Sequence, residues 1–594
     1  MQHIFEKDVH YKVPLYQRPY VWNEADQWVP LWEDLSSVAE VIEQGGSPRA
    51  HFLGASVQDK PDLPPGSIET RLLIDGQQRL TTLQLLIKAF EHVVWAMEAD
   101  SFRKALRKLV SNDHPLCTEP SEAFKIWPTN ADRDDYESVM SSFDNAEVRA
   151  NLEMASNRKR VGRTIPDAYL FFFEVISGWM EETDGEARDR RIAALYSAIR
   201  DNVRLVVIDL DDKDDAQMIF ETLNARGTPL LAADLVKNSL LSELESRDEN
   251  AEAAYNKHWQ AFDQDGAFWR QEIGRGHARR ARLELFLRHV LSLMTGRNVS
   301  AAHLYTAYRE LASAPDAPHA LERMASIHKY GVIYKRLQQG VDDPEISRHL
   351  ERIGVMDLET IYPLLLVLFD RLKNDRQGLL ASIRALDSFL VRRMVCRLST
   401  RSYGTFFLEV ADEVNGPNDV VELLIARLEK GTAEVDRWPT DAEFEKAWLG
   451  NALYENLRRP RLRMLLEEME RASRTKFAEH NHVPPNLTVE HIMPQAWQVH
   501  WPLPGIANEM EEAGDRDRLV QTIGNLTLLN DKLNPAQSNN AWVSEDGHGK
   551  RAGLERHSVL YLNKALVEQD SWTEASIIER GKSLFQLALS IWPR

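Results

Sequence analysis

Residues 72–83 constrain the fold more than any other stretch, because the periodicity of the sequence changes there at a single turn. Residues 72–74 are three consecutive apolar residues, typical of a short buried strand, and Asp75-Gly76 is a turn signal. From Gln77 onward, apolar residues recur at the spacing of one helix face. The stretch therefore predicts a strand that turns sharply into a helix, within a domain containing both α and β structure.

The predicted turn carries many polar side chains. They are a carboxylate, two carboxamides and a guanidinium, from Asp75, Gln77, Gln78 and Arg79 around Gly76. Backbone N–H groups are free at the first turn of a helix and favour an anion. Arg79 can bind a phosphate through two parallel hydrogen bonds, and Asp75 can hold a metal ion or a hydroxyl group. Two interpretations stay open, namely a phosphate-binding turn and a polar helix cap with an exposed arginine.

A second cluster of aromatic and polar residues lies near the start of the sequence. Pro14 and Pro19 favour extended backbone in the residues before them. The cluster consists of Tyr16, Gln17, Arg18 and Tyr20. Such side chains can stack on a nucleic-acid base or enclose a phosphate edge. They can equally form an aromatic edge of the core, so both interpretations stay open.

The overall composition is that of an ordinary soluble protein. With 594 residues, of which 43% are hydrophobic and 27% charged, the chain has room for three or more domains. No apolar run approaches membrane-spanning length, and the first residues lack the features of a secretory signal. The two cysteines exclude a disulfide framework and a cysteine-rich zinc site. We therefore expect a cytoplasmic protein.

The net charge of −19 argues at first sight against binding to nucleic acid. Binding depends on local basic surface, however, and the acidic residues can lie on other faces. Two arginine clusters stand out, one in residues 270–288 and one formed by Arg458, Arg459, Arg461 and Arg463. Composition alone favours a solvated helix face over a DNA contact for each cluster.

The middle of the chain has a helical pattern. Between residues 246 and 440, apolar residues recur at helical spacing and strand-like alternation is scarce. We predict an α+β, mostly helical protein of three parts. These are a mixed domain in residues 1–245, a helical connector in residues 246–440 and a further domain in residues 441–594.

The last part contains the second stretch that carries chemistry. A β-branched strand at residues 487–491 ends in Glu490 and His491, and a second strand at residues 523–529 includes Asn525. Hydrolysis of a phosphodiester needs a base for water and a cation against the charge on the phosphate. A histidine whose ring is held in place can be that base, and carboxylate and amide oxygens suit Mg²⁺. A lone Glu-His pair would also fit a purely structural contact.

Three motifs resemble those of GmrSD-type, modification-dependent restriction proteins, and they occur in the family's order. They are Asp-Gly-Gln-Gln-Arg-Leu-Thr-Thr at residues 75–82, Val-Pro-Leu-Tyr-Gln-Arg-Pro-Tyr-Val-Trp at residues 13–22 and Phe-Glu-Thr-Leu-Asn-Ala-Arg-Gly at residues 220–227. The resemblance implies a ParB/sulfiredoxin-like fold for the first domain. It also implies nucleotide binding by the turn at residues 75–79 and sensing of DNA or its modification by the cluster around Gln17.

The C-terminal motifs resemble the HNH (His-Me finger) nuclease domain of the same family, a ββα-metal fold. By this resemblance His491 is the general base and Asn525 its structural partner, while Glu490 and Asn534 hold Mg²⁺ or Mn²⁺. The choice of Asn534 over its neighbours stays open; these are Asn530, Asn539 and Asn540. Many HNH domains bind zinc through cysteine pairs, which this sequence lacks nearby, so packing must brace the domain.

Members of this family are associated with NTP hydrolysis, yet the sequence has no P-loop. The segments at residues 547–550 and 581–583 lack the upstream glycine that such a loop requires. Any NTP must therefore bind at residues 75–79, and the sequence does not reveal which NTP it is.

These features predict a Mg²⁺-dependent, NTP-regulated or NTP-hydrolysing endonuclease of phage defence. Its substrate would be double-stranded DNA with hydroxymethylated or glucosylated cytosine, and a homodimer is one option for its assembly. One alternative is an SspE-like NTPase that senses phosphorothioate in the DNA backbone and nicks. The other is an NTP-gated DNA-binding switch whose nuclease half has decayed. The intact set of Glu490, His491, Asn525 and Asn534 argues against decay.

Overall fold

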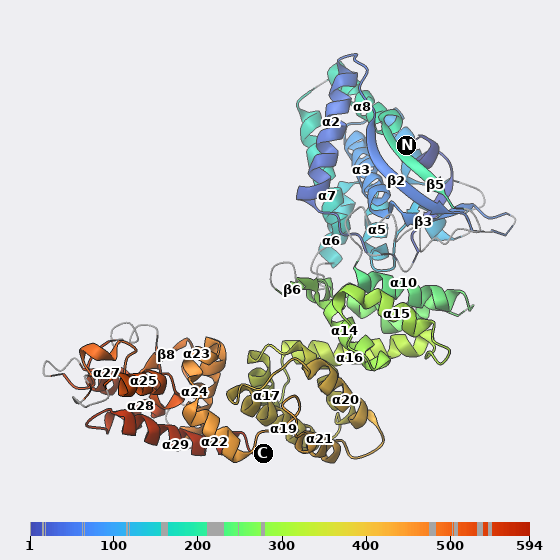
Figure 1. The fold of residues 1–594 in the computed structure, drawn as a ribbon. Helices are drawn as coiled ribbons and strands as arrows, with labels where there is room; N and C mark the ends of the chain where they lie inside the picture. Colours follow the sequence, from blue (N-terminus) through green and yellow to red (C-terminus); the bar gives the residue numbers. More distant parts are fainter. Residues whose placement is uncertain are drawn as a thin grey trace. The chain divides into compact units, whose positions relative to one another are not determined.

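The computed structural model divides the chain into two compact units, which we describe separately (Figure 1). The first comprises residues 1–288 and 300–328, and the second comprises residues 289–299 and 329–594. Both are mainly helical with small sheets, which confirms the predicted α+β class, whereas the three-part division stays a prediction. The structure describes all residues except 1, 15–16, 18, 62, 65, 114–116, 118, 156–163, 184, 211–230, 248, 275–278, 475–482, 502, 504–508, 531–538 and 545–548.

The first unit contains a five-stranded mixed sheet with the strand order β4-β1-β3-β2-β5. Strands β2 and β3 are antiparallel, whereas β1 is parallel to β3 and β4, and β5 is parallel to β2. The strands are β1 (Val9–Lys12), β2 (His51–Asp59), β3 (Glu69–Asp75), β4 (Ile126–Trp127) and β5 (Val203–Asp209). A short hairpin of β6 (Glu272–Ile273) and β7 (Arg280–Ala281) follows later in the chain.

Helices make up most of the remainder of this unit. They are α1 (Gln2–Phe5), η1 (Glu24–Trp28), α2 (Val29–Glu43), α3 (Gln77–Ala96), α4 (Asp100–Val110), η2 (Pro120–Ala123), α5 (Arg133–Met140), α6 (Asn145–Ala155), α7 (Thr164–Glu181), α8 (Gly185–Ser197), η3 (Ala198–Asn202), α10 (Ala232–Glu245), α11 (Ala251–His258), α12 (Gln260–Gln264), α13 (Gly266–Trp269), η5 (Ala301–His303) and α15 (Leu304–Ala312). Helices α14 (Arg282–Thr295) and α16 (Ala320–Gln339) include residues of both units.

Helix α3 is the centre of the first unit, and it begins directly after β3, as the change of periodicity predicts. Nearly all its side chains are buried, since α4 and α7 pack against it. The buried polar side chains are paired, with Lys88 Nζ 2.9 Å from Glu91 Oε2 and His92 Nδ1 2.6 Å from the Tyr169 hydroxyl. A helix held on several sides in this way fixes the position of the turn from which it starts.

The second unit combines helices with one two-stranded sheet. The helices are α17 (Pro344–Val355), η6 (Glu359–Ile361), α18 (Tyr362–Arg371), α19 (Arg376–Val395), α20 (Tyr403–Asn415), α21 (Val420–Lys430), α22 (Asp441–Gly450), α23 (Leu453–Asn456), α24 (Arg459–Ser473), η7 (Trp497–Val499), α25 (Glu509–Val520), η8 (Ile523–Asn525), α27 (Lys550–His557), α28 (Tyr561–Val567) and α29 (Glu574–Ile591). Across the described residues of both units, no helix is long and apolar enough to cross a membrane.

The two predicted strands near the end of the chain form an antiparallel pair. Strand β8 (Leu487–His491) lies beside β9 (Leu526–Asn530), with His491 opposite Leu526. Helix α24 packs against both strands, and α29 packs against η8, which precedes β9. The pair therefore has a helical support for each strand.

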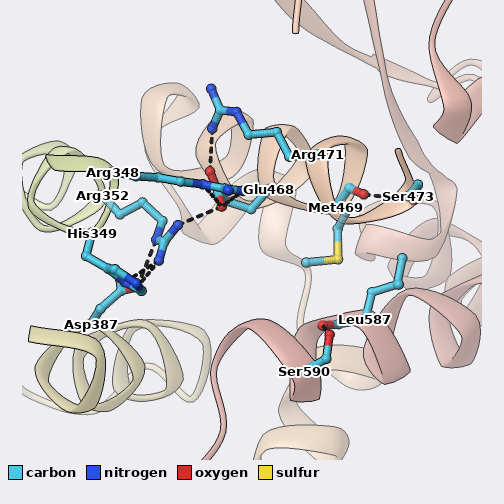
Figure 2. A network of polar contacts seen from close by, with 10 residues as sticks. All are labelled: Arg348, His349, Arg352, Asp387, Glu468, Met469, Arg471, Ser473, Leu587 and Ser590. Atoms are coloured by element: carbon cyan, nitrogen blue, oxygen red, sulfur yellow. Dashed lines mark hydrogen bonds and ion pairs between the residues drawn. The ribbon is translucent and has the colours of Figure 1, made fainter. Parts of the chain in front are cut away.

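A buried ionic network anchors α24 to two other helices, as Figure 2 shows. Glu468 of α24 has no exposed surface and accepts hydrogen bonds from Arg348 and Arg352 of α17, each at 2.7 Å, and from Arg471. Arg352 also donates to Asp387 of α19 at 2.8 Å, and His349 Nδ1 lies 2.8 Å from the same carboxylate. Breaking a buried ion pair by removing one partner is costly, so the network holds α24 in one position.

Candidate functional site

His491 stands at the end of β8 with its ring almost fully enclosed. The residue is 6% exposed, and the Tyr454 ring packs edge-on against the imidazole with the ring centres 4.1 Å apart. Nε2 lies 3.1 Å from Gln521 Oε1, and Nδ1 lies 3.4 Å from the Gln495 side-chain nitrogen. Because the Gln521 oxygen only accepts, this arrangement favours the tautomer with the proton on Nε2. Nδ1 is then the basic nitrogen.

The surroundings also keep His491 neutral. Burial is the main reason that its pKa is lowered to about 4, and the positive charges of Lys550 and Arg459 act in the same direction. The Gln521 hydrogen bond opposes this shift only in part. A neutral imidazole can accept a proton from water at neutral pH, which is what a general base must do.

Asn525 fixes the backbone that follows His491. Its Oδ1 accepts a hydrogen bond from the backbone N–H of Met493 at 2.8 Å, and its Nδ2 donates to the Met493 carbonyl at 2.8 Å. Nδ2 also donates to the Val520 carbonyl at 3.0 Å, and Trp572 Nε1 donates to Oδ1 at 3.1 Å. Asn525 has no exposed surface, so it acts on the backbone and not on a substrate. This is the position predicted for a structural asparagine.

Gly524 is required because α29 passes very close to η8. A Cβ atom at Gly524 would lie 2.2 Å from the carbonyl oxygen of Ile577, which no side chain tolerates. Arg580 of α29 donates to the Gly524 and Leu526 carbonyls at 2.8 and 2.7 Å. The Gly-Asn pair before β9 therefore locks the sheet to α29.

Lys550 was missed in the sequence analysis, and it contacts both residues at the end of β8. Its Nζ donates to Glu490 Oε1 at 2.9 Å and to the His491 carbonyl at 2.6 Å. Only 4% of the Lys550 side chain and 11% of the Glu490 side chain are exposed. Burial raises the pKa of the Glu490 carboxyl and lowers that of the Lys550 ammonium, and their attraction opposes both shifts. No local pattern links two residues 60 positions apart.

The two predicted ligands of Mg²⁺ are Glu490 and Asn534. Glu490 is already neutralised by Lys550, and Asn534 lies outside the described residues. No group of three or more histidine, cysteine, aspartate or glutamate side chains in this part of the chain is arranged to hold a metal ion. The described residues therefore do not by themselves form the predicted metal site.

The turn at residues 75–79 in the first unit, called the signature from here on, depends on Gly76. Its φ of +96° lies in the left-handed region, and a Cβ atom there would stand 3.0 Å from the Ser56 side chain. Ser56 Oγ in turn donates to the Asp75 carbonyl at 3.0 Å. Only glycine allows β2 to approach the turn so closely.

The two glutamines of the signature bind the motif at residues 13–22, called the opening segment from here on. Gln77 Nε2 donates to Gln17 Oε1 at 3.2 Å, and Gln17 Nε2 donates to the Ile74 carbonyl at 2.9 Å. Gln78 Oε1 accepts from the backbone N–H of Val21 at 2.9 Å. All three glutamines are less than 10% exposed. These hydrogen bonds join the two predicted clusters into one structural unit.

Tyr20 belongs to the core, which corrects its predicted role in DNA sensing. The residue is 5% exposed, and its hydroxyl lies 2.6 Å from Thr82 Oγ1 and 3.0 Å from Trp28 Nε1. A ring enclosed in this way is not available for stacking on a base. Tyr16, Arg18 and the motif at residues 220–227 lie outside the described residues.

Asp75 and Arg79 form the accessible part of the signature. Their side chains are 26% and 30% exposed, and Arg79 Nη1 lies 3.8 Å from Asp75 Oδ2. Arg79 also donates to the Ala55 carbonyl. One carboxylate and one guanidinium therefore face outward beside the start of α3.

The solvated-face interpretation of the first arginine cluster is wrong for Arg270. Arg270 Nη2 lies 3.1 Å from Asp234 and 3.4 Å from Asp263, and its side chain is 22% exposed. Lys237 is fully buried. Its Nζ donates to Asp263 Oδ2 at 3.1 Å and to the Gln17 carbonyl at 3.2 Å. This network ties α10 to the segment that supports the signature.

Two family models match the chain. Residues 1–241 match the N-terminal domain of the GmrSD restriction endonuclease, and residues 438–587 match the C-terminal domain of the GmrSD restriction endonucleases. The chain belongs to the GmrSD restriction endonuclease family. No curated protein matches the chain. As a member of this family, the protein is a restriction endonuclease, and its substrate is DNA.

Both candidate sites lie within the GmrSD matches. The signature turn at residues 75–79 falls in the N-terminal match, and Glu490, His491, Asn525 and Lys550 fall in the C-terminal match. Residues 242–437 lie outside both.

Proposed function

We propose that this GmrSD protein is a modification-dependent DNA endonuclease of phage defence. Its C-terminal domain would be an HNH-type nuclease that cuts, and its N-terminal domain a ParB/sulfiredoxin-like module that senses modified DNA and binds an NTP. The observation that carries the proposal is the neutral, enclosed His491 at a strand end whose backbone is locked by Asn525. Cytosine with a hydroxymethyl or glucosyl group is the proposed mark.

In the proposed reaction, His491 accepts a proton from a water molecule through Nδ1. The water oxygen forms a bond to the phosphorus, the ester P–O bond breaks, and the leaving oxygen takes a proton from solvent. Gln521 holds the imidazole through Nε2, Lys550 holds the His491 carbonyl, and Asn525 holds the backbone of Met493 just after it. A general base contributes about 10²- to 10⁴-fold to such a step.

Mg²⁺ or Mn²⁺ is the proposed cofactor, because phosphate chemistry needs positive charge and oxygen ligands suit these ions. Asn534 remains the proposed ligand. Glu490 would join it only if Lys550 released the carboxylate, so we assign no step to a metal at Glu490.

The substrate is tested with a panel of DNA duplexes that are plain, hydroxymethylated, glucosylated or phosphorothioated. We expect cleavage of the cytosine-modified duplexes with Mg²⁺ or Mn²⁺, and no loss of activity with a zinc-specific chelator. Nicking of phosphorothioated DNA alone would support the SspE-like alternative. Binding without any cleavage would support the DNA-binding switch, and a need for tightly bound zinc would contradict the proposed cofactor.

We propose that the NTP binds at Asp75 and Arg79, which supply the accessible polar groups of the signature. Replacing Arg79 with alanine should lower NTP affinity about tenfold or more and abolish NTP hydrolysis and phage restriction. The reason is that a charge-assisted hydrogen bond contributes about 1.5–3 kcal/mol, and a bidentate pair contributes more. Isothermal titration of NTP into the purified variant measures the effect.

Arg149 provides the control for this variant, since it is exposed in the same unit and pairs with Glu174 at 3.2 Å. Arg149→Ala should bind the NTP normally. If nucleotide regulates cleavage, modified DNA and NTP must change each other's affinity by the same factor. The signature would be only a structural turn if modified DNA left the NTP affinity unchanged, NTP left the DNA affinity unchanged, and Arg79→Ala restricted phage like the wild type.

A further inference from the structure

One arginine of the second cluster is placed beside the candidate base. The guanidinium carbon of Arg459 lies 3.4 Å from the centre of the Tyr454 ring, and the same ring packs against His491. Arg459 also donates to the Tyr454 carbonyl. The backbone N–H of Tyr454 donates to the Gln521 carbonyl at 3.1 Å, so Gln521 positions both the base and the ring. Arg459 lies over the Tyr454 ring, and this ring contacts the imidazole edge-on, so the three residues form one continuous row of contacts.

The charge of Arg459 is available to a ligand. The residue is exposed, and no carboxylate in the described part of the chain forms an ion pair with it. Its positive charge lowers the pKa of His491, which shows that the guanidinium lies within electrostatic reach of the imidazole. An arginine stacked on an aromatic ring is pre-organised and keeps its N–H edges free for a planar, anionic group.

The structure distinguishes Arg459 from two other members of its cluster, Arg461 and Arg463. Arg461 donates to the Met356 carbonyl, and Arg463 pairs with Glu467 at 3.4 Å. Neither of these arginines contacts Tyr454 among the described contacts, so a solvated or structural role accounts for both. Composition alone does not distinguish the four arginines of this cluster.

Arg459 also stands on a rigid element. It is the first residue of α24, which the network in Figure 2 holds through Glu468. Glu470 adds a second anchor by accepting from the backbone N–H groups of Tyr561 and Leu562 at 3.1 and 2.9 Å. A site on a fixed helix presents its charge at a constant distance from His491.

We propose that Arg459, supported by Tyr454, binds a backbone phosphate of DNA next to the phosphodiester that is hydrolysed by the water activated by His491. The inference rests on the proposed nuclease function and assigns a substrate-binding residue to it. A chain with a net charge of −19 needs local cations to approach DNA, and a stacked guanidinium that pairs with no carboxylate of the described residues is suited to this task. Arg459 would therefore contact the DNA backbone and read no sequence.

The test is the affinity of the full chain for a fluorescein-labelled plain duplex, measured by anisotropy across a range of salt with a chelator present. A plain duplex is adequate because phosphate contacts do not depend on sequence. Arg459→Ala should bind about tenfold or more weakly, as expected for loss of a charge-assisted hydrogen bond, and should lower the salt slope by about one phosphate contact. Tyr454→Phe should bind normally, whereas Tyr454→Ala should weaken binding because Arg459 loses its support.

Arg463→Ala is the matched control, since Arg463 is exposed on the same helix and should leave affinity and slope unchanged. If the wild-type chain binds DNA and Arg459→Ala has the same affinity and slope, the inference is wrong and the proposed function stands. If the wild-type chain binds neither this duplex nor a cytosine-modified duplex, the proposed function fails and the inference fails with it. The unfolding midpoint of Arg459→Ala should match the wild type, because an exposed side chain contributes little to stability.

Discussion

Replacing His491 with alanine is expected to lower the rate of DNA cleavage by about 10²- to 10⁴-fold, the contribution of a general base. The variant keeps the Asn525 and Lys550 contacts, which involve the backbone of Met493 and the carbonyl of residue 491 and not the His491 ring. Binding of DNA should therefore change little. Single-turnover cleavage of a modified duplex, together with anisotropy on the same duplex, separates the two effects.

His557 is the control for this variant, because it is exposed on α27 in the same domain. His557→Ala should cut at the wild-type rate. Since alanine leaves Gln521 without its partner, His491→Asn provides a second variant that retains a polar side chain at the position. Wild-type cleavage by either His491 variant would remove the HNH assignment.

Replacing Lys550 with methionine is expected to lower the free energy of unfolding of the second unit by about 3–5 kcal/mol. Methionine keeps most of the buried volume but leaves Glu490 without its cation, and an uncompensated buried charge costs about this much. Loss of the bond to the His491 carbonyl should also impair cleavage. Urea unfolding followed by tryptophan fluorescence measures the stability change.

The double variant Glu490→Gln with Lys550→Met isolates the ion pair. It removes both charges, so it should recover most of the stability lost in Lys550→Met. Lys582→Met changes an exposed lysine of α29 and should have little effect. Equal stability of Lys550→Met and Lys582→Met would show that the pair with Glu490 does not stabilise the domain.

Local patterns were enough to predict several elements of this protein. The apolar run at residues 72–74 and the helical spacing after Gln77 predicted β3 and α3, because a change of period reflects a change of backbone conformation. The strand that carries His491 was also predicted, whereas the strand expected at residues 523–529 begins only at Leu526, after the short helix η8 that contains Asn525. These features depend on neighbours within one element, so one sequence determines them.

The direction and partners of the functional side chains were decided only by the tertiary structure. The signature divides into Gln77 and Gln78, which face inward, and Asp75 and Arg79, which face outward. This division depends on where the opening segment packs, more than fifty residues earlier in the chain. The sequence alone left all of these residues equally available to a nucleotide.

The same reason explains the contacts around His491. Lys550 meets Glu490 across 60 residues, and Arg459 reaches His491 only through the ring of Tyr454. Residue types and spacing were enough to propose His491 as the base and Asn525 as its structural partner, since both lie at the ends of the paired strands. The cations beside them depend on how helices pack against the sheet, and long-range packing leaves no periodic signal in a single sequence.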